Sequence, residues 1–503
     1  MKKQILKTYL YSITIIIISI IYIEGCAVSP QIIEQEKINE LKINIDKHFN
    51  DSLFASAHWG ALIKSLKTGK TWYSLNAEKM FMPASNEKIP TGASALLMLG
   101  PDFTFDTYLC YRGKIIDSTL DGDIIVFGNG DPTLYNRFFK DPTDLFILWS
   151  GMLKAKGIKK ITGNIIGDDK AFGTDTLGFG WSFDGLDSWY SAEVGALQLN
   201  ENYIDIKIIP PSNENDSIKI VPNLPSNFYK IINDMAVEDT GSTRLNYSRA
   251  CGTNNIIFSG SVKRGSREVT VSPTITNLTL FYVTVLKEVF EDHGIDVDGE
   301  PIGCRSLSNW NYKPEDFTVI DDHKSASLKE ILTGMLKRSQ NLYAETLVRT
   351  LGWKETGLGS FGNGKKIVEG ELSKFGIKPG SYRYMDGSGL SRYDYISPEQ
   401  IVTILSGMWN SKLREIWCNA LPIAGVDGTL SNRMKGTKAE GNVHAKTGTI
   451  SNVRSLSGYV TTADGEPLVF SFIVNGHLQT SKETEDLTDG VLEMLAKFTG
   501  SSK

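Results

Sequence analysis

The chain opens a predicted buried helix with Pro83-Ala84-Ser85-Asn86-Glu87-Lys88, which an apolar stretch follows. Three residues are close to one helical turn, so we expect the Lys88 amine to lie beside the Ser85 hydroxyl. A serine hydroxyl is a weak nucleophile until a neighbouring base takes its proton, and a neutral amine one turn away can be that base. The pair alone is weak evidence, because any solvated helix face can hold a serine and a lysine three residues apart.

Two further motifs follow in the order that serine acyl-transfer enzymes of the Ser-x-x-Lys kind require. Ser339-Gln340-Asn341 lies between two predicted helices, and Lys446-Thr447-Gly448-Thr449 lies on a predicted strand at 446–450. Two β-patterned runs come next, at 453–460 and 467–474, and predict a hairpin behind an edge strand. The ordered triple is much more specific for a serine nucleophile than any of its parts.

With these residues the chain resembles the class C, type-4 penicillin-binding proteins, which are D-alanyl-D-alanine carboxypeptidases and endopeptidases. The resemblance covers most of the sequence after Trp59. Two residues depart from the family pattern. Gln340 stands where an acid is common, and Pro90 follows Lys88 by two positions, where we expect a local kink. Further blocks similar to the family lie at 128–134, 341–347, 386–392 and 425–430.

The resemblance implies an α+β fold, with a catalytic domain of the penicillin-binding-protein/β-lactamase type. Such a domain has a five-stranded antiparallel sheet flanked by helices. The long gap between Lys88 and Ser339 indicates that a large β-rich insertion splits this domain. We expect the catalytic domain to comprise 46–98 and 317–503, an accessory domain to comprise 99–202 and 274–316, and a nested accessory domain to comprise 203–273.

The implied activity is that of a serine-type D-Ala-D-Ala carboxypeptidase or endopeptidase that acts on peptidoglycan stem peptides and is acylated by β-lactam antibiotics. Ser85 would be the nucleophile and Lys88 its base. Ser339 would relay a proton towards the leaving amine, and Asn341 would position Lys88 and the substrate amide. Lys446 would attract the terminal carboxylate of the substrate, and burial together with the Lys446 charge would lower the pKa of Lys88.

The residues around Lys446 have implied binding roles. The hydroxyls of Thr447 and Thr449 would complete the hydrogen bonds to the substrate carboxylate. The backbone N–H groups of Ser85 and Thr449 would form the oxyanion hole. Gly448 has no side chain, so the substrate could pair with the strand edge as an added strand.

A pocket for the substrate side chain is implied by Arg392 and by residues of the insertion. In family members that prefer wall peptides, equivalent residues hold the free end of diaminopimelate. Arg392 would take its carboxylate, Asp184 its amine, and Trp189 or Tyr190 would pack on its methylenes. The alternative is that Arg392 and Asp184 are ordinary surface or inter-domain salt-bridge residues.

Composition excludes several other classes of protein. The chain has 503 residues and a net charge of -5 without a basic stripe, which argues against nucleic acid as a partner. It lacks His-Glu-x-x-His and Cys-x-x-Cys, so we expect no zinc and no other cofactor. Two alternative functions stay open: a β-lactamase or related serine esterase, and a wall-binding lipoprotein without catalytic activity.

The N-terminus predicts export to the periplasmic side of a bacterial cell envelope. Three lysines precede an apolar run that is shorter than a membrane span, which is typical of a signal peptide over 1–25. Ile23-Glu24-Gly25-Cys26 resembles a lipobox, so we expect a lipidated Cys26, a membrane anchor through that lipid and a tether over 26–45. An unlipidated signal or a short uncleaved anchor is the alternative. The other four cysteines could form disulfides or be small buried apolar residues.

Overall fold

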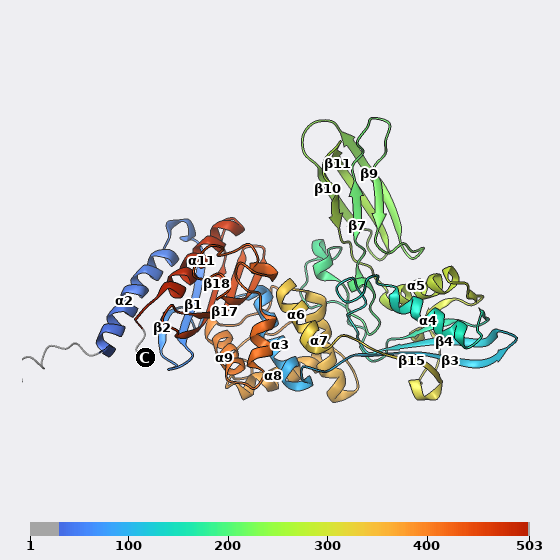
Figure 1. Ribbon diagram of the computed structural model, residues 1–503, viewed down its shortest axis with the longest axis horizontal. Coiled ribbons are helices and arrows are strands. Elements are labelled where there is room, and N and C mark those ends of the chain that lie inside the picture. Colours follow the sequence, from blue (N-terminus) through green and yellow to red (C-terminus); the bar gives the residue numbers. More distant parts are fainter. Residues whose placement is uncertain (1–29, 501–503) are drawn as a thin grey trace, which may run out of the picture.

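The computed structural model describes residues 30–500, so the predicted signal peptide and Cys26 lie outside the described residues. No helix within the described range is long and apolar enough to cross a membrane. Two bodies are visible in Figure 1: a sheet flanked by helices at one end, and a second sheet at the other, from which a small β module projects.

A five-stranded antiparallel sheet forms the core of the first body, as predicted. Its strand order is β16-β17-β18-β1-β2, which places β16 (His444–Ile450) at the edge. The other strands are β17 (Val453–Thr461), β18 (Pro467–Asn475), β1 (His58–Ser65) and β2 (Thr71–Leu75). Because β1 pairs with β18, the two ends of the chain meet in one sheet. Blue and red ribbons therefore lie side by side in Figure 1.

Helices cover both faces of this sheet because apolar side chains alternate along its central strands. On β18, Phe470 and Phe472 pack with α2 (Pro30–Phe49) and α11 (Ser481–Lys497), whereas Val469 belongs to the core on the opposite face. That opposite core contains α3 (Lys88–Leu99), α6 (Leu328–Arg338), α7 (Asn341–Thr356), α8 (Phe361–Lys374), α9 (Pro398–Trp409) and α10 (Arg414–Ala420).

The insertion is β-rich, as the sequence predicts. Its larger sheet packs against α4 (Asp144–Ala155) and α5 (Leu278–Asp292) and contains β3 (Asp106–Ile116), β4 (Thr119–Gly128), β5 (Lys160–Ile161), β6 (Ile165–Asp168), β13 (Asp296–Val297), β14 (Pro301–Gly303) and β15 (Thr318–Lys324). Two three-stranded sheets form the projecting module: β12 (Val269–Val271), β7 (Ile206–Ile209) and β8 (Lys219–Pro222), and β10 (Arg244–Arg249), β11 (Asn255–Lys263) and β9 (Lys230–Glu238).

The strand β15 lies just after residue 317, where the sequence predicts a domain boundary. β15 falls in the segment that the sequence assigns to the catalytic domain, yet it pairs with β3 of the insertion. Its central residues Asp321, Asp322 and His323 are polar, so it lacks the alternating apolar pattern of a half-buried strand. In the domain division that we propose, the chain returns to the catalytic domain after Lys324.

Candidate active site

Ser85 and Lys88 lie at the junction between a short 3₁₀ turn, Ala84–Glu87, and α3. Residues three apart eclipse each other in a 3₁₀ turn, and Lys88 Nζ is 3.0 Å from Ser85 Oγ. Ala84 has a φ of 48°, a left-handed conformation that is strained for a residue with a side chain. Pro90 is the third residue of α3, where backbone N–H groups have no partner within the helix, so it removes no hydrogen bond from α3.

The contacts of the Lys88 amine suit a neutral base. Lys88 is fully buried, and its Nζ lies 2.6 Å from Asn341 Oδ1 and 2.7 Å from the Ser388 carbonyl oxygen. Both oxygens can only accept hydrogen bonds. A neutral amine has two N–H groups for these acceptors, which leaves its lone pair for the Ser85 hydroxyl proton.

Burial is the main cause of the shift in the pKa of Lys88. It lowers the pKa to about 7, against the opposing charges of Asp386, Glu345 and Glu87. Burial therefore lowers the pKa as expected, whereas the Lys446 charge, the second expected cause, is not among the main contributions. Lys446 is also fully buried, and burial, followed by the charge on Lys88, holds its own pKa well below the usual value.

A buried carboxylate organises the loop that presents the Ser388 carbonyl to Lys88. Asp386 accepts hydrogen bonds from the backbone N–H groups of Ser388, Gly389 and Ser391 at 3.1, 2.6 and 2.6 Å, and from Trp181 Nε1 at 2.8 Å. These contacts fix the direction of the Ser388 carbonyl. The sequence flagged the block 386–392 without assigning Asp386 a role.

Glu345 supports the same loop from α7. One carboxylate oxygen accepts from the backbone N–H groups of Gly387 and Ser388 at 2.8 and 3.0 Å. Burial and the charge of Asp386 raise the pKa of Glu345 to about 7. Part of the negative charge that would otherwise keep Lys88 protonated is thereby removed near neutral pH.

The second serine approaches from the loop between α6 and α7. Ser339 ends α6 in a left-handed conformation, and its Oγ accepts from Lys446 Nζ at 2.9 Å. Asn341 starts α7, and its Nδ2 donates to the Tyr190 carbonyl oxygen at 2.6 Å, which ties the insertion to the site. With Lys88 on Asn341 Oδ1, the five residues implied as catalytic by the sequence lie in one region.

The structure also gives a reason for Gln340, the departure noted in the sequence. Its side-chain amide donates to Glu201, a buried carboxylate that also accepts from Arg137 Nε at 2.7 Å and from the Tyr343 hydroxyl at 2.6 Å. An acid at position 340 would face the Glu201 carboxylate, whereas an amide can donate to it. Glu201 therefore anchors the Ser339 loop to the insertion.

Gly448 lets the nucleophile turn lie directly against β16. A Cβ at this position would stand 2.8 Å from the Pro83 carbonyl oxygen, 3.0 Å from Ser85 N and 2.1 Å from Ser455 Oγ. Ser455 Oγ donates to the Pro83 carbonyl at 2.6 Å, and Asn86 Nδ2 donates to the Lys446 carbonyl at 3.0 Å. The space left by the missing side chain is thus occupied by this turn, which adds a packing reason for the glycine to the expected pairing of the substrate with the strand edge.

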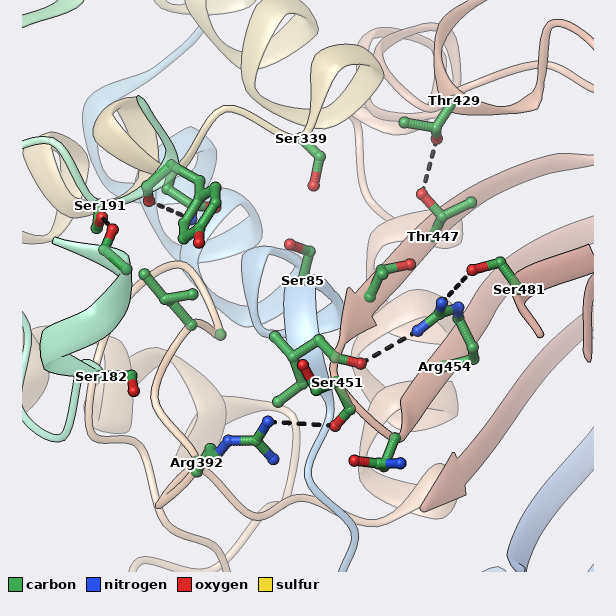
Figure 2. A pocket seen from close by; sticks show the side chains of 18 of the residues that line it. Ser85, Ser182, Ser191, Ser339, Arg392, Thr429, Thr447, Ser451, Arg454 and Ser481 are labelled. Carbon is green, nitrogen blue, oxygen red and sulfur yellow. Dashed lines mark hydrogen bonds between the residues drawn. The ribbon is translucent and has the colours of Figure 1, made fainter. Parts of the chain in front are cut away.

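Ser85 opens onto a cleft of about 880 Å³, which Figure 2 shows from close by. Its lining includes Ser85, Ser339, Asn341, Thr447 and Thr449 together with Asp184, Trp189, Tyr190 and Arg392. The sequence did not single out Thr429, whose hydroxyl accepts from the Thr447 hydroxyl at 2.7 Å. It belongs to the family-like block 425–430.

The four residues of the implied side-chain pocket lie on this same cleft. Arg392 donates to the Ser451 carbonyl oxygen at 3.3 Å and makes no ion pair within 4.0 Å with a carboxylate of the described chain. The hydrogen bond from Ser182, followed by weaker effects that include the charge of Arg392, lowers the pKa of Asp184. A direct salt bridge between Arg392 and Asp184 is therefore not the reason for their position.

Metal ligands and disulfides are not features of the described part of the chain. Residues 30–500 contain no cluster of histidine, cysteine or acidic side chains arranged to hold a metal ion. Cys110, Cys251, Cys304 and Cys418 are all free thiols.

A serine paired with a buried lysine, a second serine on a loop and a Lys-Thr-Gly edge strand define a serine-acylating hydrolase with the penicillin-binding-protein/β-lactamase fold. The chain belongs to the D-Ala-D-Ala carboxypeptidase 3 (S13) family, whose model matches residues 41–497. This is a family of serine-type peptidases.

Individual relatives agree with this assignment. The chain is 31% identical over 483 residues to a D-alanyl-D-alanine carboxypeptidase of Actinomadura sp. strain R39, covering 92% of this chain and 86% of that protein. It is 28% identical over 426 residues to D-alanyl-D-alanine carboxypeptidase DacB of Haemophilus influenzae, covering 83% and 85% of the two chains.

The fold agrees as well. The crystal structure of penicillin binding protein 4 from H. influenzae superposes with a TM-score of 0.78 at 26% identity, covering 90% of this chain and all of that chain. A complex of that protein with a β-lactam superposes with a TM-score of 0.72 at 25% identity, with the same coverage.

We predict that Gly448→Ala slows acylation by penicillin by about 100-fold, the scale of a displaced oxyanion donor. The added methyl group would push the turn that carries the Ser85 N–H away from β16. Stopped-flow or gel-based labelling with a fluorescent penicillin measures the rate. Gly370→Ala on α8 is the matched control, because a Cβ there meets open space. A folded Gly448→Ala protein that acylates at the parent rate would contradict this role.

Proposed function

We propose that this protein is a peptidoglycan D-alanyl-D-alanine carboxypeptidase and endopeptidase that works through an acyl-enzyme on Ser85. The observation that carries the proposal is the buried Lys88 amine, which lies 3.0 Å from Ser85 Oγ with two acceptor-only oxygens on its other sides. Membership of the S13 family and the names of its relatives support the substrate class.

Acylation follows from the positions of these groups. Ser85 Oγ attacks the carbonyl carbon of the penultimate D-alanine while its proton moves to Lys88 Nζ. The carbonyl oxygen becomes an oxyanion, which the backbone N–H groups of Ser85 and Thr449 would stabilise. Ser339 would pass a proton to the leaving amine, so that the peptide bond breaks and the terminal D-alanine departs. Water then hydrolyses the Ser85 ester, and the serine is restored.

The terminal carboxylate of the substrate has a binding site beside this reaction. Lys446 lies beneath it on β16, and the Thr447 and Thr449 hydroxyls border the cleft on the same strand. Asn341 holds Lys88 and would also contact the substrate amide. A substrate that pairs antiparallel with β16 places its C-terminus at Lys446 and Thr447.

The two alternative functions are less well supported. A β-lactamase differs from a penicillin-binding protein in fast hydrolysis of the acyl-enzyme, and the family assignment covers residues 41–497 as a carboxypeptidase. A wall-binding protein without activity has no need of a fully buried lysine beside a serine, because burial of an amine is costly unless function requires it.

Acylation by penicillin tests the proposal directly. Intact-protein mass spectrometry should show a single covalent adduct on the parent protein, because Ser85 lines the cleft with the Lys88 amine 3.0 Å from its Oγ. Ser85→Ala should show no adduct. The matched variant Ser94→Ala, which changes a buried serine of α3, should keep it. An adduct of undiminished yield on Ser85→Ala would overturn the assignment of the nucleophile.

We further propose that Arg392, Asp184 and the aromatic pair Trp189 and Tyr190 bind the free end of diaminopimelate. All four line the cleft, Asp184, Trp189 and Tyr190 from the insertion and Arg392 from the catalytic domain, and Arg392 has no carboxylate partner within 4.0 Å among the described residues. Its guanidinium is therefore available for a carboxylate of the substrate.

Arg392→Ala should lower kcat/KM on a diaminopimelate-containing pentapeptide by about 10- to 100-fold, the cost of a lost charge-assisted hydrogen bond. The loss on a simple acyl-D-Ala-D-Ala substrate should be much smaller, because that substrate lacks the side chain. Steady-state kinetics on both substrates measures the difference. Equal losses would place Arg392 in the shared machinery or in the fold.

The proposed location is the bacterial cell envelope, where peptidoglycan is found. We propose that a signal peptide directs the protein there and that a lipidated Cys26 anchors it to a membrane. Acyl chains contribute about 0.8 kcal/mol for each buried CH₂ group, so a multiply acylated terminus holds a protein on a bilayer. Metabolic labelling with an alkyne fatty acid tests the anchor, and a parent protein that takes up no label would exclude it.

A further inference from the structure

The cleft continues past the end of β16 to Arg454, on which the charge of Glu485 acts although no carboxylate is in ion-pair contact with it. Arg454 is on β17 directly opposite Thr449, so the two side chains share a face of the sheet. Its Nη1 donates to the carbonyl oxygens of Ile450 and Val453 at 3.1 and 2.9 Å. Its Nη2 donates to Ser481 Oγ, as Figure 2 shows. No carboxylate within residues 30–500 lies within 4.0 Å of it, and its Nε is buried without a partner.

The positive charge of Arg454 acts on His477, which lies in the same part of the cleft. His477 is 3% exposed and borders the cleft together with Gln479 and Ser481. Its Nδ1 lies 3.2 Å from the Gln479 carbonyl oxygen, and its Nε2 has no partner in the described chain. Burial, followed by the charge of Arg454, lowers the pKa of His477.

The direction of the substrate brings its upstream residues to this end of the cleft. A peptide that lies antiparallel to β16, with its terminal carboxylate at Lys446 and Thr447, extends about 3.4 Å for each residue towards Ile450 and beyond. Two arginine side chains lie at this end of the cleft. Arg392 donates a hydrogen bond to the Ser451 carbonyl oxygen, and Arg454 donates one to the Ile450 carbonyl oxygen. The part of the substrate that precedes the reacting D-alanine therefore meets two guanidinium groups.

We propose that Arg454 binds a second carboxylate of the substrate, upstream of the one assigned to Arg392. This proposal rests on the proposed function, because it takes the substrate to be a peptidoglycan stem peptide. In such a peptide a γ-linked D-glutamate precedes diaminopimelate, and its free α-carboxylate is the next anionic group along the chain. Arg454 and the Ser481 hydroxyl would hold that carboxylate and make the enzyme selective for stem peptides that carry it.

Two substrates that differ in one group test this assignment. The first is L-Ala-γ-D-Glu-diaminopimelyl-D-Ala-D-Ala, and the second carries D-isoglutamine, whose α-carboxamide replaces the carboxylate. The parent protein should prefer the carboxylate substrate by about 10-fold in kcat/KM, the scale of a hydrogen bond to a charged group at a partly exposed site. Arg454→Gln should reduce this preference to less than about two-fold, and Arg454→Lys should keep part of it.

Arg338→Gln is the charge-matched control. Arg338 lines the same cleft next to Ser339, so its loss removes one positive charge from the cleft without touching the far end. The preference ratio should stay at the parent value in this variant. The melting temperature and the final yield of penicillin adduct report whether each variant is folded.

A ratio near one in the parent protein, or an unchanged ratio in a folded Arg454→Gln variant, would overturn the carboxylate site. Either result leaves the proposed function standing, because it compares two substrates that are both cleaved. Failure of the parent protein to cleave either peptide or to form a penicillin adduct would instead remove the proposed function, and with it the carboxylate site.

Discussion

The site depends on the burial of one amine. Lys88 is enclosed by α3, α7 and the loop that begins at Asp386, and that enclosure lowers its pKa to about 7 although three acidic residues oppose the shift. Two of these acidic residues also have a structural role in the loop that contacts Lys88. Asp386 and Glu345 accept the backbone N–H groups of the loop, and in doing so they aim the Ser388 carbonyl at Lys88. The carboxylates of Asp386 and Glu345 therefore fix the loop that encloses the Lys88 amine, and their charge limits how far the pKa of Lys88 falls.

The rest of the catalytic geometry follows from how closely the nucleophile turn packs on the sheet edge. Gly448 and the Ser455 hydroxyl bring Pro83 and Ser85 against β16, and Asn86 locks the turn to the Lys446 carbonyl. The insertion completes the arrangement from the other side. Its Tyr190 carbonyl holds Asn341, and its Glu201 carboxylate holds Gln340, so the Ser339 loop is fixed by a segment distant in sequence. We infer that the insertion positions catalytic residues as well as substrate.

The ordered motifs were sufficient to predict the family, the resemblance to that family implied the antiparallel sheet, and the β-patterned runs after Lys446 predicted its edge strand. The contacts that set the pKa of Lys88 and position the catalytic residues could not be predicted from the sequence. Two of these contacts are made by the backbone carbonyl oxygens of Ser388 and Tyr190. Every residue has such a carbonyl, so the residue type does not indicate which one is used. The acids around Lys88 come from separate elements that only the tertiary structure brings together. The strand β15 was not predicted because its central residues are polar. The contact of Gly448 with the Pro83 turn was not predicted because the two are more than 360 residues apart in sequence.

The central claim is that Lys88 is a neutral base in the folded protein near physiological pH. The pH dependence of the rate of penicillin acylation, measured between pH 5.5 and 10.5 on the intact protein, tests it most directly. Protonation of the amine removes the base, so the rate should rise with pH through a single ionisation near 7. It should be about tenfold lower at pH 6 than on the plateau above pH 8. A rate that is constant across this range, or that rises only near pH 10, would contradict the claim.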